Sequence, residues 1–181
     1  MSDVSGGRDL LYPLSLFRRD GGAPLPGFTV VEGGAMPEPF HSLLVHHGDM
    51  TSRLEAHFGA PITLRVLHCE QRPGQYLREV VLCAGPEKMP VEYGAIEIDL
   101  DAFSSEVRAL IVEGREPLGG LLNRFAIEYR SEPRVFITLG PDPGMRGHLG
   151  APAASVFHGR CNVLLGAGGR VLAHIVEILK P

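Results

Sequence analysis

The stretch Gln75-Tyr76-Leu77-Arg78-Glu79-Val80-Val81-Leu82-Cys83 indicates how the chain folds. Apolar residues occupy both sets of alternating positions, which is typical of a strand that is covered on both faces. Each face nevertheless carries one charge, because side chains alternate along a strand: Arg78 shares a face with Val80, and Glu79 lies on the other. The stretch therefore predicts a central strand that directs an arginine into an apolar layer.

An arginine in an apolar layer requires an explanation. Burying its charge costs several kcal/mol unless a carboxylate pairs with it, and that carboxylate belongs either to the protein or to a ligand. The first alternative makes Arg78 a structural residue that pairs with a neighbouring glutamate or extends to the edge of the sheet. The second makes it part of a binding site, and the strand alone does not decide between them.

Length and composition predict one folded domain. The chain has 181 residues, of which 44% are hydrophobic and 21% are charged, as in ordinary globular proteins. The net charge is -4 and lysine and arginine form no basic stripe, so we expect no nucleic-acid partner.

The cysteines and the apolar runs bear on the compartment. Cys69, Cys83 and Cys161 lie in apolar, strand-like runs without metal-type spacing, which favours reduced core thiols. Residues 1–20 lack the apolar run of a signal peptide, and no stretch is long enough to span a bilayer. We therefore expect a cytoplasmic protein without a membrane span.

Glycine and proline divide the chain into an arm and a domain. Residues 1–36 are rich in both and predict a poorly structured N-terminal arm, whereas residues 37–181 predict the folded domain. Within the domain, periodicity and capping residues predict helices near 40–47, 49–58, 101–114 and from Pro117. Alternation predicts strands at 62–70, 75–83, 91–99, 125–130, 134–139, 155–165 and 170–179. The Gly- and Pro-rich residues 140–152 predict a long loop.

The last strand mirrors the Arg78 strand. One of its faces is apolar except for a single carboxylate, and consists of Val171, Ala173, Ile175, Glu177 and Leu179. Two charges of opposite sign, each set in an apolar layer, indicate a common interior site. A structural ion pair between Arg78 and Glu177 explains the same pattern and stays open.

Motifs for bound cofactors are missing. The sequence has no P-loop, dinucleotide fingerprint or nucleophile elbow, and no histidine pair has the spacing of a helical metal site. We therefore expect no cofactor and no metal.

Several short motifs occur together in the order found in one enzyme family. They are Asp49-Met50-Thr51-Ser52-Arg53-Leu54-Glu55, Tyr76-Leu77-Arg78-Glu79-Val80-Val81-Leu82-Cys83-Ala84, Pro117-Leu118-Gly119 and Ile175-Val176-Glu177-Ile178-Leu179. In this order and rough spacing, residues 37–181 resemble the chorismate pyruvate-lyases. The resemblance implies a single α+β domain with a largely antiparallel six-stranded sheet, helices packed on it, and flaps over a buried site. It also implies cofactor-free conversion of chorismate to 4-hydroxybenzoate and pyruvate, a reaction of ubiquinone biosynthesis.

The resemblance assigns roles to individual residues. Arg78 matches the arginine that binds the ring carboxylate, for which a bidentate guanidinium is well suited. Leu118 matches a backbone contact, and Met50 matches a methionine that lines the pocket. Glu177 matches a glutamate that we expect to bind the substrate hydroxyl and assist proton transfer. The expected catalytic residues are Arg78 and Glu177.

One departure from the family pattern leaves a second function open. Ala95 follows Gly94 where the family commonly has an arginine, so a cation for the second carboxylate of chorismate is missing. Arg160 is the candidate that compensates for it. The alternative is a non-catalytic domain on the same fold that binds a small aromatic carboxylate. Either function implies a small-molecule partner, and the sequence leaves monomer and dimer equally open.

Overall fold

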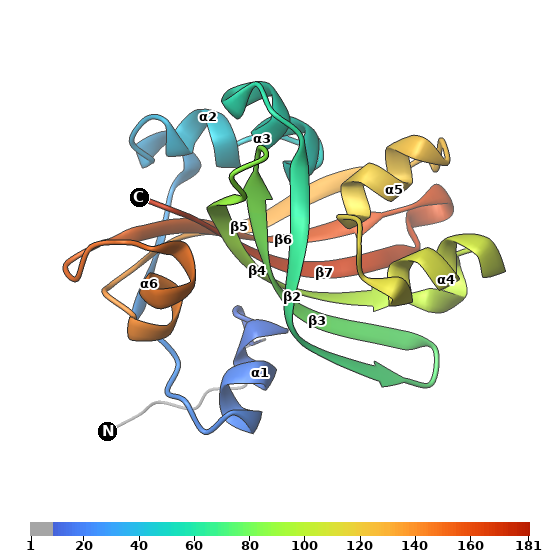
Figure 1. Ribbon diagram of the computed structural model, residues 1–181, viewed down its shortest axis with the longest axis horizontal. Helices are drawn as coiled ribbons and strands as arrows, with labels where there is room; N and C mark the ends of the chain where they lie inside the picture. Colours follow the sequence, from blue (N-terminus) through green and yellow to red (C-terminus); the bar gives the residue numbers. More distant parts are fainter. Residues whose placement is uncertain (1–8) are drawn as a thin grey trace.

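An antiparallel sheet forms the centre of residues 9–181, the part of the chain that the computed structural model describes (Figure 1). It has seven strands in the order β1-β5-β6-β7-β4-β3-β2, and every neighbouring pair is antiparallel. The strands are β1 (Phe28–Val31), β2 (Ile62–Arg72), β3 (Gln75–Ala84), β4 (Met89–Asp99), β5 (Arg130–Leu139), β6 (Phe157–Leu165) and β7 (Val171–Leu179). The predicted single α+β domain is confirmed, with one strand more than the six that the family resemblance implied.

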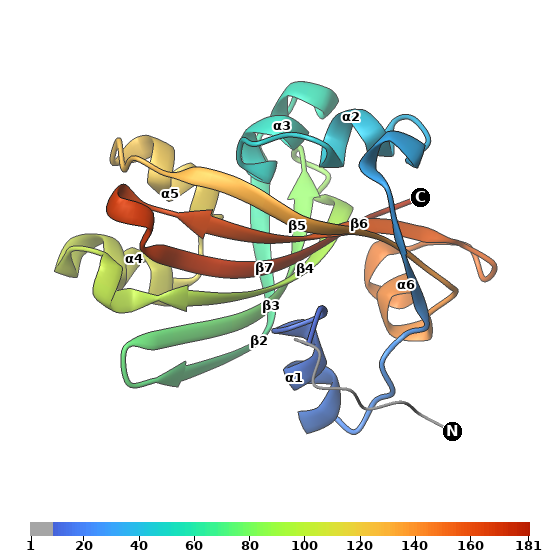
Figure 2. The same ribbon diagram turned by 180° about the vertical axis from the view of Figure 1, so that it is seen from behind.

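Helices cover both faces of the sheet (Figures 1 and 2). They are α1 (Leu14–Asp20), α2 (Phe40–Leu44), α3 (Met50–Phe58), α4 (Ser105–Glu113), α5 (Leu118–Arg124) and α6 (Pro143–Leu149). Helices α2 to α5 pack on the face that carries Arg78, and α1 and α6 pack on the face that carries Glu79. No helix among the described residues has the length and apolar character needed to cross a membrane.

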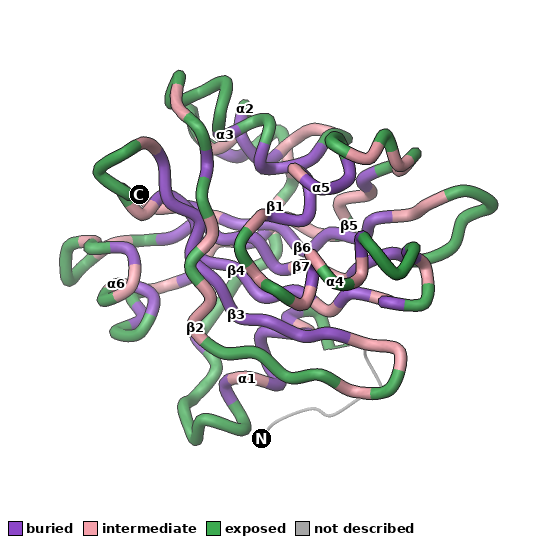
Figure 3. The backbone as a smooth tube through the Cα atoms, turned by 45° about the vertical axis from the view of Figure 1, so that its right-hand side comes forward, coloured by how far each residue is buried: buried purple, intermediate pink, exposed green. Residues whose placement is uncertain are grey.

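The central strands are buried, as Figure 3 shows for the middle of the sheet. In β3, every residue from Tyr76 to Ala84 is buried, which confirms the prediction of a strand covered on both faces. On one face, Val81 and Tyr93 pack against α1 and α6. On the other, Ile96 and Ile98 pack against α4 and α5. The Arg78 strand therefore lies between two separate apolar layers.

Part of the segment that we expected to be a poorly structured arm carries ordered elements. Helix α1 packs on the sheet through Leu11 and Leu14, and Arg18 forms a buried ion pair with Asp142 at 3.0 Å. Strand β1 pairs with β5 at the edge of the sheet and supplies the additional strand. Residues 1–8 lie outside the described residues. The four-residue strand β1 is too short and too exposed to give a clear alternating pattern.

Two other local predictions are wrong. The expected loop at 140–152 contains α6, because Asp142 caps the helix, Pro143 occupies its first turn and Gly150 ends it in the left-handed conformation. The expected strand at 125–130 does not form. Strand β5 instead continues through Pro133, where the register with β6 shifts.

Candidate ligand-binding site

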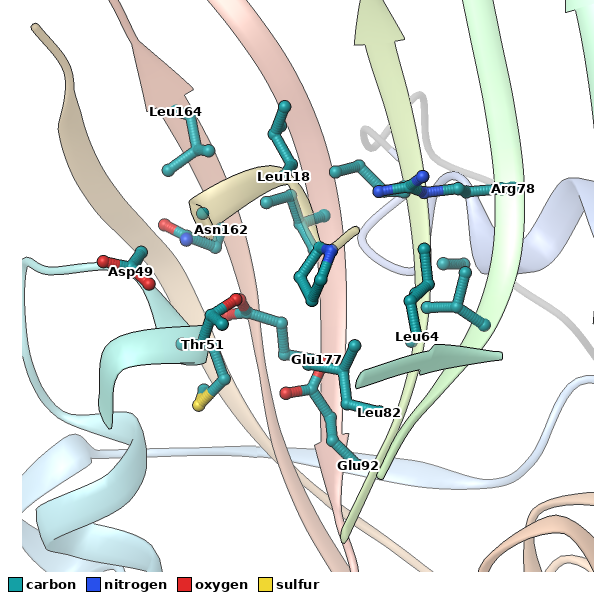
Figure 4. Close-up of a pocket in the computed structure, with 18 residues that line it drawn as sticks. Asp49, Thr51, Leu64, Arg78, Leu82, Glu92, Leu118, Asn162, Leu164 and Glu177 are labelled. Carbon is teal, nitrogen blue, oxygen red and sulfur yellow. The ribbon is translucent and has the colours of Figure 1, made fainter. Parts of the chain in front are cut away.

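A pocket lies between the Arg78 face of the sheet and helices α3 and α5 (Figure 4). It has a volume of about 540 Å³, part of which is open to solvent. The lining side chains are mostly apolar, and the charged ones are Asp49, Arg78, Glu92 and Glu177.

The strand register places three of these charges on the same face of the sheet. Arg78 on β3 lies opposite Ile96 on β4. Two residues further along β4, Gly94 lies opposite Glu177 on β7, and the following pocket-facing position of β4 is Glu92. Because paired residues in a sheet share a face, all of them point into the space under α3 and α5. Figure 4 shows Arg78 towards one end of the pocket, with Glu92 and Glu177 towards the other.

Arg78 is buried without a carboxylate partner. Its side chain is 2% exposed, and it donates long hydrogen bonds of 3.4 Å to the backbone carbonyls of Ile111 and Glu116. Its Nε atom has no partner, and within residues 9–181 the guanidinium forms no ion pair. Burial lowers the pKa of Arg78 to about 10, so the group still carries its charge at neutral pH. An anionic ligand would supply the missing partner.

Glu177 has a different partner from the one considered in the sequence. It lies opposite Arg160 on β6, and the Arg160 Nε donates to a Glu177 carboxylate oxygen. The Nη1 of Arg160 also donates to the carbonyls of Leu44 and His46, at 3.0 and 3.1 Å. Arg160 is fully buried and is not among the residues that line the pocket. Its charge is thus used inside the protein, which argues against the expected role of Arg160 as a second substrate anchor.

Glu92 was missed in the sequence. Its side chain is 3% exposed, and its Oε2 atom is buried without a hydrogen-bond partner among the described residues. Burial and the nearby Glu177 raise the pKa of Glu92 well above its usual value of 4.5, although Arg160 opposes the shift. The alternation of side chains along this strand could have revealed it, because Glu92, Gly94 and Ile96 share one face. Gly94 interrupted the apolar pattern of that face and concealed the position of Glu92.

A hydrogen-bond network holds the helical wall of the pocket. Asp49 caps α3 by accepting from the Ser52 amide at 2.7 Å, and it also accepts from Tyr129 Oη at 2.8 Å and Asn123 Nδ2 at 3.2 Å. These bonds lower the pKa of Asp49 despite its burial. At Gly119 on α5 an added Cβ would lie 2.6 Å from the Asp49 carboxylate, so only glycine permits this approach of α5 to α3. Asp49 is therefore a structural residue of the wall.

The structure brings most of the predicted site residues together. Met50, Arg78, Leu118 and Glu177 all line the one pocket, and Arg160 does not. Ala95 packs with Tyr93 and other residues of the opposite apolar layer. Its side chain therefore points away from the pocket. A larger side chain at 95 would enter that layer, so Ala95 does not explain which charges the pocket has.

Glu79, the second charged residue of β3, lies on the face of the sheet opposite the pocket. Glu79 accepts a hydrogen bond from Tyr93 Oη and contacts His68 Nδ1 at 2.6 Å. Tyr93 in turn lies 3.5 Å from Arg18, whose guanidinium is paired with Asp142. This network ties α1 and α6 to the sheet, so Glu79 has a structural role.

Comparisons with known proteins identify the fold. No family model and no curated protein sequence matches the chain. Among solved structures, it is similar to PhnF from Mycobacterium smegmatis, with a TM-score of 0.58 and 13% identity over 75% of this chain and 65% of that chain. It is also similar to the effector domain of PhnF, with a TM-score of 0.55 and 12% identity over 74% and 88% of the two chains. A third is the ligand-binding domain of a putative GntR-family transcriptional regulator from Bordetella bronchiseptica, with a TM-score of 0.50 and 14% identity over 65% and 85%.

The fold is thus the chorismate lyase-like fold, which these ligand-binding domains share. The chain spans about two thirds of the length of PhnF, 65% of that chain. At 12–14% identity, the likeness shows the fold alone.

The expectation of a chorismate lyase that supplies ubiquinone biosynthesis is wrong. The similar structures are named as PhnF, the effector domain of PhnF and the ligand-binding domain of a putative transcriptional regulator, and none of these is named as a lyase. The pocket offers a physical reason. Chorismate carries two carboxylates, whereas Arg78 is the one cationic side chain among the described lining residues. At the other end, two buried glutamates would face the second carboxylate.

Proposed function

We propose that this protein is a non-catalytic domain that binds a small carboxylate in the pocket, with the carboxylate held by Arg78. The observation that carries the proposal is the burial of an unpaired guanidinium at the pocket wall. Removing a charge from water costs several kcal/mol, and a bidentate carboxylate compensates for that cost with two charge-assisted hydrogen bonds. The ligand therefore completes an ion pair that the folded chain leaves open.

The lining of the pocket favours an apolar body on the ligand. Between the charged ends, the walls consist of branched aliphatic side chains: Leu64, Val80, Leu82, Ile96, Leu118, Leu164 and Ile175. Such a lining buries a ring or short hydrocarbon at about 25 cal/mol per Å² of apolar surface. A small aromatic carboxylate satisfies both the apolar walls and Arg78.

The local chemistry supports binding rather than turnover. Glu177, the expected proton-transfer residue, is instead paired with the buried Arg160, so its carboxylate is engaged by the protein itself. The similar structures named as effector and ligand-binding domains support a regulatory role for this binding. In that role, ligand binding by this domain would change the state of a regulator.

The test compares ligands of different charge. Benzoate, its neutral analogue benzamide and the dicarboxylate isophthalate are each added to the pure protein, and the shift in melting temperature and the Kd by calorimetry are measured. We expect benzoate alone to stabilise the protein clearly, because bound ligand raises stability by mass action. In Arg78→Met the shift should vanish. Equal stabilisation by benzamide, or an unchanged Kd in Arg78→Met, would contradict the proposal.

A further inference from the structure

Besides Arg78, the pocket holds a second buried ionisable group without a partner. Arg160 and Glu177 neutralise each other as an ion pair. This leaves Arg78 and Glu92, one basic and one acidic group, buried in the same pocket without an ion pair to each other or to another described residue. Figure 4 shows them at different ends of the site. A group of opposite charge on the ligand would satisfy each of them.

We propose that the ligand is a zwitterion, with its carboxylate at Arg78, an ammonium group at Glu92 and an apolar spacer between the two. This inference rests on the proposed function and names the class of ligand. A buried carboxylate oxygen without a partner is costly, and natural proteins keep few of them. An ammonium donor in the pocket removes that cost and adds a charge-assisted hydrogen bond.

The strand geometry sets the length of the spacer. Arg78 and Leu82 lie four residues apart on β3, and Leu82 pairs with Glu92. At about 3.3 Å per residue, the two positions are roughly 13 Å apart along the sheet. The side chains shorten this gap but do not close it, since they form no ion pair. An α-amino acid, with both charges on one carbon, is therefore too short, and an ω-amino carboxylate or an aminoalkyl benzoate has the required span.

The protonation of Glu92 before binding makes ligand binding measurable as a release of protons. Burial and Glu177 raise the pKa of Glu92, and Arg160 opposes them, so the empty pocket favours the protonated carboxyl group. An arriving ammonium favours the ionised carboxylate. On binding, the O–H bond of Glu92 breaks, the proton passes to solvent, and the carboxylate accepts from the ammonium. Binding of a zwitterion therefore releases protons, up to one per site.

The experiment uses three para-substituted benzoates that differ at one atom or group. They are 4-(aminomethyl)benzoate, 4-(hydroxymethyl)benzoate and 4-methylbenzoate, titrated into the whole chain at pH 7 by calorimetry in two buffers of different ionisation enthalpy. We expect the aminomethyl probe to bind at least tenfold more tightly than the other two and to release protons on binding, up to one per site. The other two should release none.

Two variants test whether Glu92 causes the tighter binding of the aminomethyl probe. In Glu92→Gln the aminomethyl probe should lose its advantage of at least tenfold, whereas the exposed Glu87→Gln should keep it. If Glu92→Gln does not fold, the proton release and the relative affinities of the three probes for the unmodified chain still test whether the pocket prefers a zwitterion. Equal binding of all three probes, or tighter binding of the hydroxymethyl probe, would overturn this inference and leave the proposed function standing. Binding of none of them would overturn both.

Discussion

Arg160 and Glu177 lie directly opposite each other on β6 and β7 and form an ion pair buried within the protein. Glu177 is the carboxylate that the sequence analysis considered as a partner for Arg78, and it is paired with Arg160 instead. Arg78 consequently remains without a carboxylate, although it lies in the same pocket as Glu177. Because Glu177 is paired with Arg160, it does not serve as the counterion of Arg78.

The first prediction concerns that ion pair. Glu177→Gln should lower the free energy of unfolding by about 3–5 kcal/mol, because it leaves the fully buried Arg160 charge without a counterion. The double variant Arg160→Met/Glu177→Leu should recover most of the loss, since two apolar side chains replace two charges. Urea denaturation followed by circular dichroism measures both. A Glu177→Gln protein as stable as the parent would show that the pair contributes little.

The second prediction has the opposite sign. Arg78→Met should leave the free energy of unfolding unchanged or raise it by about 1–3 kcal/mol, because it removes a buried charge whose hydrogen bonds are long and incomplete. The same variant should lose the stabilisation by benzoate. The control is Arg65→Met on β2, an exposed arginine outside the pocket. A large loss of stability in Arg78→Met without ligand would mean that Arg78 is structural.

The third prediction follows from the raised pKa of Glu92. Between the usual value of 4.5 and the higher value in the folded state, the folded protein keeps a proton that the unfolded chain has lost. The free energy of unfolding therefore decreases with rising pH in that window. Glu92→Gln removes this dependence, so its stability relative to the parent should increase as the pH rises from 5 to 8.

Thermal melts at intervals of half a pH unit measure the third prediction, with the exposed Glu87→Gln as the control. The control should follow the parent at every pH. A parallel pH profile for Glu92→Gln and the parent would show that Glu92 is ionised in the folded state.

The elements that were predicted correctly are those with a clear local sequence pattern. The fully buried β3 and the alternating β7 have long apolar patterns, and these placed the centre of the sheet correctly. Helix α3 was marked by its cap Asp49. By contrast, α1 and β1 lie among glycines and prolines, and they are held by contacts with distant residues such as Asp142. Tertiary packing of this kind is not visible in local sequence.

The predictability of the site was limited by strand register. Alternation placed Arg78 and Glu177 on apolar faces, but which charges meet depends on the neighbouring strand and its alignment. Arg160 meets Glu177 because β6 pairs with β7 in one particular register. Glu92 enters the pocket because β4 lies between β3 and β7. The residue pattern of a single strand shows neither which strand lies beside it nor the register in which the two strands pair.

The last prediction concerns the close packing of β6 on β7 beside the ion pair. A Cβ added at Gly159 would lie 2.5 Å from the backbone carbonyl oxygen of Glu177, a contact that only a backbone shift relieves. Gly159→Ala should therefore destabilise the protein by about 1–3 kcal/mol, the usual cost of overpacking.

Gly120→Ala is the matched control for Gly159→Ala. Gly120 lies inside α5 with open space around its Cβ position, so alanine there should raise stability by about 0.5–1 kcal/mol. Urea denaturation of both variants gives the two changes side by side. If Gly159→Ala matches the parent, β6 and β7 are free to separate by several tenths of an ångström, and the Arg160–Glu177 pair is less rigid than its geometry indicates.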